Sequence, residues 1–336
     1  MKAYKRILIT ILGALLCLTA LSGCSSAQTK QEQRVIGTCA GYDVLYEELR
    51  YLTLTYKQIF EAQYGAGIWD DPTTAEQHRA ELEETVWRLI LNNYAVLAAS
   101  DKYLPQTNAI QNDSIQEAVD GMIEEMIESC GGKKEFRREL KTMNATENLL
   151  RFTFGVAQLE NELMYALSVD WQLFMGDSQK FYNWLQEGNA VYVQHIFIEN
   201  DAGEDVEENR RIAEDVRLKL LTKEVTLAQM IGSALNEDYQ NAAPYYVVRE
   251  VYKPEIEEQV FSLFAPGDVS SVVETDTGFY VFVEVEETEG TLENQLNNLF
   301  TSYRAAKTED VVEEFKENLV LELNEYGRSI DLLTIQ

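Results

Sequence analysis

The sequence predicts an α+β protein in which a small mixed domain interrupts a helical one, and three observations predict it. Residues 43–187 carry amphipathic helical periodicity almost throughout, with little glycine and no strand pattern. At Gly188 the character changes to short β-branched and aromatic runs alternating with short helices, up to about residue 287. After Gly290 the helical periodicity returns. A chain of 336 residues with 46% hydrophobic residues is long enough for two domains with sizeable cores.

The helical part is expected to hold one early strand, several long helices and one late strand. The early strand covers 34–41, and the helices cover 43–64, 73–103, 114–130, 144–169, 178–186, 291–306 and 309–324. Thr73 with Glu76, and Ser114 with Glu117, have the spacing of a capping box, which places two of the helix starts. The last segment, Ser329 to Ile335, is strand-like, and we expect it to pair with the early strand.

The middle part is expected to have the order β-α-α-β-α-β-β. The strands cover 190–198, 245–249, 269–273 and 278–286, and the helices cover 206–221, 226–235 and a short stretch that begins at Pro254. Proline is favoured in the first turn of a helix, where its missing N–H has no partner to lose. About one hundred residues in this order make a compact α+β domain.

The charge balance is strongly acidic. The chain has 28 Lys and Arg against 57 Asp and Glu, a net charge of −29 at pH 7. Residues 1–23 hold three basic residues and no acid, so their removal leaves −32. Such a surface repels phosphate, which excludes a general nucleic-acid binder. It also repels an anionic membrane surface, so membrane attachment requires a lipid or a helix.

Residues 1–23 have the layout of a signal peptide. Three basic residues precede an uncharged run, Ile7 to Leu21, which is shorter than the roughly 20 residues of a spanning helix. Leu21-Ser22-Gly23-Cys24 follows and resembles the bacterial lipoprotein signal, which implies cleavage before Cys24 and lipidation of its thiol. The alternative is an uncleaved anchor helix, and both place the body outside the cytoplasm. Residues 24–33 are polar and are predicted to be a tether.

The chain offers little material for a metal or redox site. Cys39 and Cys130 have no C-x-x-C spacing and no nearby histidine, which argues against zinc or a redox pair. A disulfide between them is permitted outside the cytoplasm, and two small buried apolar side chains are the favoured interpretation. The two histidines are His78, expected to be exposed at a helix start, and His195. We therefore expect no metal and no cofactor.

Four stretches of the middle part resemble one family. Val193-Gln194-His195-Ile196 resembles the first strand of the parvulin-type peptidyl-prolyl isomerases, whose histidine points into the site. Residues 260–270 are similar to its AF-x-L-x-x-G-x-x-S stretch, and 275–281 to its T-x-x-G-x-H-I strand. Asn236-Glu237-Asp238 is similar to its S-x-D turn. With the lipoprotein signal and the helical parts, the whole layout resembles the extracytoplasmic foldase chaperones of the PrsA/SurA type.

The resemblance implies domain bounds and site residues. A SurA-N-like helical chaperone domain would comprise 34–187 and 289–336, with a parvulin-like domain inserted at 188–288. The implied polar residues of the site are His195, Asp238 and Tyr280, catalytic if the domain is active. The implied substrate-binding residues are Tyr252, Ile256 and Phe261, of which the first two stand at the proline-pocket positions of the family.

Two departures from the family pattern bear on activity. Tyr280 stands where the family has its second histidine, and Asn241-Ala242-Ala243-Pro244-Tyr245 replaces the glycine-rich G-G-D-L-G. The resemblance therefore implies a foldase that binds unfolded, newly secreted polypeptides, with weak or absent isomerase activity, anchored in the bacterial cell membrane through Cys24. The alternative is an active peptidyl-prolyl isomerase, and a homodimer is possible. A solute-binding lipoprotein is disfavoured, because α/β repeats are missing.

Overall fold

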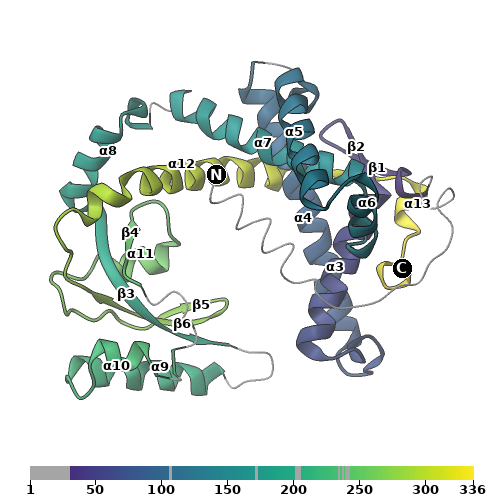
Figure 1. Cartoon of the computed structure of the whole chain (residues 1–336). Coiled ribbons are helices and arrows are strands. Elements are labelled where there is room, and N and C mark those ends of the chain that lie inside the picture. Colours follow the sequence, from purple (N-terminus) through teal and green to yellow (C-terminus); the bar gives the residue numbers. More distant parts are fainter. Residues whose placement is uncertain are drawn as a thin grey trace. The chain divides into compact units, whose positions relative to one another are not determined.

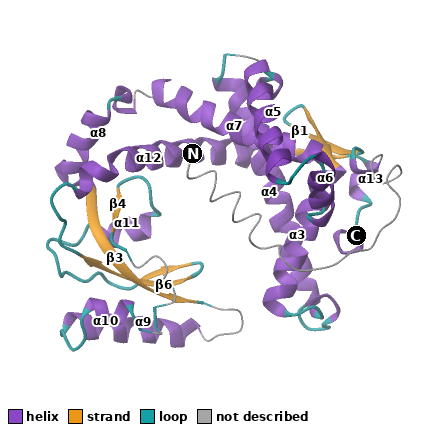
Figure 2. Cartoon of the chain, viewed as in Figure 1, coloured by secondary structure: helices purple, strands orange, loops and turns teal. Residues whose placement is uncertain are grey.

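The computed structural model describes residues 31–105, 108–170, 173–200, 206–233, 235–236, 238 and 243–336 (Figure 1). The chain forms two compact units: unit 1 is Met1–Leu163 with Val311–Gln336, and unit 2 is Met164–Asp310. Helices and two small antiparallel sheets make it an α+β protein, as predicted (Figure 2). Cys24 and the predicted signal peptide lie outside the described residues. None of the helices that are described is long and apolar enough to cross a membrane.

Unit 1 combines a three-stranded antiparallel sheet, of order β2-β1-β7, with a set of helices. Its strands are β1 (Val35–Cys39), β2 (Tyr42–Leu45) and β7 (Leu321–Leu323). Its helices include α3 (Tyr46–Tyr64), α4 (Ala75–Tyr103), α5 (Asp113–Ser129), α6 (Lys133–Thr142) and α13 (Glu325–Arg328). Helix α7 (Glu147–Asp170) begins in unit 1 and ends in unit 2, and α12 (Thr291–Asn318) begins in unit 2 and ends in unit 1.

The predicted C-terminal strand is wrong. Residues 329–335 contain the short 3-10 helix Leu332–Thr334, and the late partner of β1 is β7. After β7, Asn324 fixes the chain to β1, because its backbone N–H donates to the Ile36 carbonyl at 3.0 Å and its side-chain amide donates to Val35 at 2.8 Å. Pairing partners rather than β propensity therefore decide which C-terminal segment becomes the strand.

Two details of the predicted helices are also corrected. At the start of α4 the capping box does not form; instead a carboxylate oxygen of Asp71 accepts from the backbone N–H groups of Thr73 and Thr74 at 2.8 and 3.3 Å. The two expected helices after Gly290 are one helix, α12. Thr308 does not break it, because its hydroxyl donates to the Arg304 carbonyl one turn earlier, at 2.9 Å.

The core of unit 1 is aliphatic and aromatic. Its fully buried large side chains are Ile36, Leu49, Leu82, Ile90, Tyr94, Leu97, Ile123, Phe136 and Leu159. Both cysteines among the described residues are free, Cys39 buried and Cys130 half-buried. His78 was expected to be exposed, which is wrong. It is 9% exposed, because its ring packs 4.5 Å from the ring of Tyr64 and its Nδ1 lies 3.2 Å from Glu81.

Two adjacent carboxylates of α3, Glu47 and Glu48, are buried in unit 1. The carboxylate of Glu47 accepts from the Thr146 hydroxyl and the Asn148 amide, and that of Glu48 from Asn93 and Tyr94. Both glutamates line a cavity of about 270 Å³, with Arg151 on its wall. The first turn of a helix favours negative charge, which accounts for acids at this place but not for their burial.

Unit 2 is built on a four-stranded antiparallel sheet of order β4-β3-β6-β5 (Figure 1). The strands are β3 (Ala190–Glu199), β4 (Tyr245–Val248), β5 (Val273–Thr275) and β6 (Gly278–Glu284). The helices are α8 (Ser178–Trp184), α9 (Val206–Leu221), α10 (Leu227–Ile231), α11 (Pro254–Val260) and the first part of α12. The observed order from β3 to β6 is β-α-α-β-α-β-β, as predicted. The expected strand 269–273 shrinks to β5, preceded by a single bridge from Val269 to Val283.

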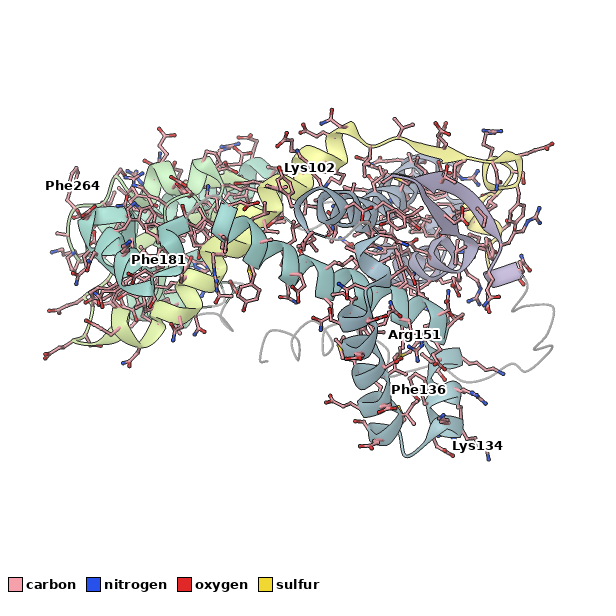
Figure 3. All side chains as sticks on the ribbon, turned by 90° about the horizontal axis from the view of Figure 1, so that it is seen from above. Lys102, Lys134, Phe136, Arg151, Phe181 and Phe264 are labelled. Atoms are coloured by element: carbon pink, nitrogen blue, oxygen red, sulfur yellow. The ribbon has the colours of Figure 1, made fainter. Side chains whose placement is uncertain are left out.

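The alternation of β3 assigns its residues to opposite faces of the sheet. Ile196 and Ile198 face one side and pack in a cluster with Val216 and Met230 of α9 and α10. Val193 faces the other side and packs in a cluster that Ile256 and Phe261, on and just after α11, also join. A third cluster joins α8, β4 and α12 around Phe181, whose buried side chain Figure 3 marks. His195 is two residues after Val193, so its side chain lies on the same side of the sheet. We call this side, on which α11 packs, the α11 face.

Candidate functional site

The site is centred on His195, in the middle of the longest strand. In the antiparallel register of β3 and β6, His195 lies opposite Phe282, and Phe197 lies opposite Tyr280. All four side chains therefore belong to one face of the sheet. His195 is only 8% exposed, so its imidazole is a buried polar group that requires hydrogen-bond partners.

Both ring nitrogens of His195 have such partners. Nε2 lies 3.1 Å from Oδ2 of Asp238, and Nδ1 lies 2.9 Å from the hydroxyl oxygen of Tyr245. A carboxylate oxygen can only accept, so the Nε2–H donates to Asp238 and Nδ1 accepts from the Tyr245 hydroxyl. The three residues thus form a chain, Tyr245 to His195 to Asp238, that defines one tautomer of the neutral imidazole.

The protonation of the site follows from its burial. Burial lowers the pKa of His195 below its ordinary value of 6.5, and the hydrogen bond and charge of Asp238 oppose this without reversing it. The imidazole is therefore neutral at pH 7. Unit 2 gains stability as the pH rises towards 6.5, because the unfolded chain binds this proton more tightly. Burial also raises the pKa of Tyr245, and that of Tyr280, so both hydroxyls stay protonated.

An aromatic wall adjoins the imidazole. The Tyr280 ring meets the His195 ring edge-on at 5.3 Å between centroids. Tyr280 also lies 4.4 Å from Phe197 and 5.7 Å from Phe282, with the Phe282 ring nearly parallel to it. The Tyr280 ring thus contacts one phenylalanine across the strands and another along its own strand.

The predicted substrate-binding side chains come from the segment that leads into and out of α11. Tyr252, Ile256 and Phe261 pack, half-buried, on the same cluster as Tyr245 and Tyr280. The turn before α11 is held by Glu257, which accepts from the backbone N–H groups of residues 251 and 252, both at 3.1 Å. The two hydrogen bonds hold the backbone at Tyr252, and the side chains of Tyr252 and Ile256 both pack on the apolar cluster of this face.

Asp238 reaches the site through a turn held by Asn236. The Asn236 side chain, 2% exposed, accepts from the backbone N–H of Phe197 at 3.1 Å and donates to the Ile231 carbonyl at 3.2 Å. It therefore joins the end of α10 to β3. Asp238, two positions further along the chain, lies next to His195.

The structure brings all six sequence-predicted residues of the middle part to one face of the sheet of unit 2. Two contributors were missed: Tyr245, which was expected only as a strand residue, and Asn236, which was noted only as part of a turn. Its position on β4 could have revealed Tyr245. It lies opposite Val193, so its side chain is on the same face of the sheet as Val193 and His195. Among the described residues, no group of three or more His, Cys, Asp or Glu is arranged to hold a metal ion.

This geometry suits binding of a proline ring more than covalent chemistry. Rotation about the prolyl bond needs no covalent intermediate; it needs an apolar contact for the ring and polar groups around a twisting carbonyl. Tyr252 and Ile256 supply apolar surface. The polar groups are His195 and its two partners, whose hydrogen bonds are directed at one another.

No protein-family model and no curated protein matches the chain. Solved structures similar to the chain include PrsA proteins of Gram-positive bacteria, described as foldases or peptidyl-prolyl isomerases. The PrsA structure from Bacillus anthracis is 12% identical, with 70% of this chain and 96% of that chain covered and a TM-score of 0.38. That from Streptococcus pneumoniae is 13% identical, with 90% and 99% covered and a TM-score of 0.33. At these values the likeness carries no argument about function.

Proposed function

We propose that the protein is an extracytoplasmic foldase that binds proline-containing segments of unfolded, secreted polypeptides on the α11 face of unit 2. The observation that carries the proposal is the apolar surface of Tyr252 and Ile256 beside a buried, fully hydrogen-bonded His195. A proline ring adds apolar contact there without disturbing the imidazole. Unfolded chains expose such segments, and a foldase needs to bind them only transiently.

Isomerase activity is proposed to be weak. The neutral His195 has one donor and one acceptor, and both are used by Asp238 and Tyr245. Catalysis would require one of these bonds to open in a buried place, which costs about 1–3 kcal/mol for each group left without a partner. At about 1.4 kcal/mol per tenfold change in rate, this slows turnover by about one to two orders of magnitude.

An active isomerase is the second candidate. The hydrogen bond between His195 and Asp238 and the Tyr280 hydroxyl favour it, since both present polar groups beside the apolar surface. Exchange NMR on a short Xaa-Pro peptide decides between the two. For a foldase with weak turnover, the peptide binds, while cis-trans exchange remains close to the uncatalysed time of tens of seconds. Fast exchange that is lost in His195→Ala establishes the enzyme instead, and absence of binding refutes both.

The helical residues 34–187 and 289–336 are proposed to hold longer client segments. Described helices expose large apolar side chains, among them Ile59 and Tyr64 of α3. Adaptable apolar surface of this kind suits clients of many sequences. A chain in which Glu187 is joined to Thr291 by a flexible linker should fold by circular dichroism and still slow the aggregation of a denatured secreted protein. If the isolated residues 190–287 suppress aggregation and the linked helical chain does not, the function belongs to the parvulin-like part.

Attachment to the outer face of the cell membrane through Cys24 is also proposed. Leu21-Ser22-Gly23-Cys24 after a short basic segment supports it. Cys24→Ala should abolish incorporation of labelled fatty acid and release the chain from the membrane fraction. Label retained on that variant would contradict a lipid anchor at this thiol.

A further inference from the structure

An arginine adjoins the apolar side of the site. Arg249 follows directly after β4, and its guanidinium lies 3.9 Å from the centroid of the Phe261 ring. Stacking of this kind uses the flat face of the guanidinium and leaves the N–H groups along its edge able to donate. Because Arg249 is exposed, these donors face water in the unbound protein.

Among the described residues, Arg249 has no carboxylate partner. The arginines of α9 do: Arg210, Arg211 and Arg217 each form an ion pair with at least one glutamate. Other exposed arginines of the described residues, Arg79 and Arg137 among them, also form no ion pair, so Arg249 is distinguished by its place beside the site.

Two carboxylates close to Arg249 in sequence are engaged elsewhere. Glu250 lies 2.9 Å from Lys307 and accepts from Tyr303, and Glu257 accepts from two backbone N–H groups. Lys253 is paired with Asp276 at 3.0 Å. Among the described residues near the site, Lys253 is thus ion-paired and Arg249 is not.

We propose that Arg249 selects client segments in which a carboxylate lies next to the proline. The inference rests on the proposed function. Phe261 packs on the same cluster as Tyr252 and Ile256, so its ring connects the proposed proline contact to the guanidinium. A guanidinium over an aromatic ring still presents a fork of donors, which matches the two oxygens of a carboxylate. The substrate class is thus a prolyl segment flanked by Asp or Glu.

The acidic chain as a whole does not cancel this preference. At physiological salt the Debye length is about 8 Å, so most of the remote negative charge is screened at the site. A carboxylate in direct contact with Arg249 is screened much less. An exposed ion pair contributes up to about a fivefold change in affinity, and we expect a preference of that size.

The test compares three labelled peptides that differ only beside the proline, where they carry Glu, Gln or Lys. Fluorescence anisotropy measures their binding to the full chain, to Arg249→Gln and to Arg211→Gln. The last variant makes the same charge change on α9, at the other face of the sheet. The parent and Arg211→Gln should bind the Glu peptide about fivefold more tightly than the Gln peptide, and 0.5 M salt should reduce this ratio. In Arg249→Gln the ratio should fall to about one.

Two outcomes overturn the inference, and they are distinguishable. If the parent binds all three peptides equally, or if Arg249→Gln keeps the preference, Arg249 does not select the client, although prolyl binding stands. If none of the peptides binds to any variant, the proposed function fails as well. Should Arg249→Gln not fold, Arg249→Lys keeps the charge and loses the fork, and a retained full preference in that variant refutes bidentate recognition.

Discussion

Replacement of Glu48 by glutamine is expected to stabilise unit 1 at neutral pH and to weaken it in acid. Glu48 is 3% exposed, and its hydrogen-bond donors among the described residues are the neutral groups of Asn93 and Tyr94, at 2.7 and 3.2 Å. Burial raises the pKa of Glu48 from 4.5 to about 7, although the two hydrogen bonds lower it, and the charge of Glu47 adds to the rise. The folded chain therefore holds this proton more tightly than the unfolded chain does.

The size of the effect follows from the two pKa values. Below pH 4.5 Glu48 is protonated in both states and costs nothing. Between pH 4.5 and 7 the unfolded chain loses its proton first, so the free energy of unfolding falls by about 1.4 kcal/mol per pH unit. Above pH 7 the full cost of about 3 kcal/mol is in place. Glutamine never ionises, but its NH₂ group replaces one hydrogen-bond acceptor, at a cost of about 1 kcal/mol. The free energy of unfolding of Glu48→Gln should therefore exceed that of the parent by about 2 kcal/mol at pH 8.

Hydrogen exchange followed by mass spectrometry can test this, because peptides from α3 and α4 report the opening of unit 1 alone. The opening free energies, corrected for the intrinsic pH dependence of exchange, are compared between the parent and Glu48→Gln from pH 5 to pH 8. Glu83→Gln, an exposed residue of α4, controls for the change in net charge. A difference between Glu48→Gln and the parent that is the same at pH 5 and at pH 8 would refute the reasoning.

Three further predictions concern unit 2. Asp238→Asn should lower the pKa of His195 further, since Asp238 supplies the hydrogen bond and charge that raise it; a proton NMR titration of the two histidines measures this, and a rise would contradict it. Tyr245→Phe should shift the ¹⁵N resonance of the His195 Nδ1 and weaken unit 2 by about 1 kcal/mol, as hydrogen exchange can show; an unmoved resonance would mean that the hydroxyl does not donate. Gly278→Ala should lower the thermal midpoint of unfolding sharply, because Gly278 has a φ of 153° and a Cβ there would come within 2.2 Å of a backbone atom. The control Gly232→Ala should change the midpoint little.

The site strands could be predicted from the sequence because their pattern is local. β3 and β6 alternate β-branched and aromatic residues, and the parity of His195 and Tyr280 places both on one face once the strands pair. The helix at Pro254 follows from the fixed φ of proline. Local propensity and tertiary pairing agree in these elements, so the sequence alone is informative.

Other features depend on contacts between distant segments, and local patterns do not reveal them. The strand β7 has three residues, too few for any periodicity, and only its pairing with β1 makes it a strand. The hydrogen bond from Tyr245 to His195 joins residues fifty positions apart. The burial of Glu48 depends on donors from α4, and the stacking of Arg249 on Phe261 depends on the path of the chain around α11.

Under the proposed function, the hydrogen bonds of His195 would separate binding from turnover. Contact with a proline ring is apolar and non-directional, so the surface of Tyr252 and Ile256 suffices for it. Stabilising the twisted amide is directional, and it needs a donor or acceptor that is not already used. Here the donor of the imidazole serves Asp238 and its acceptor serves Tyr245. The same two bonds that make a buried histidine stable thus remove it from reaction, which supports a foldase that holds prolyl segments more than it isomerises them.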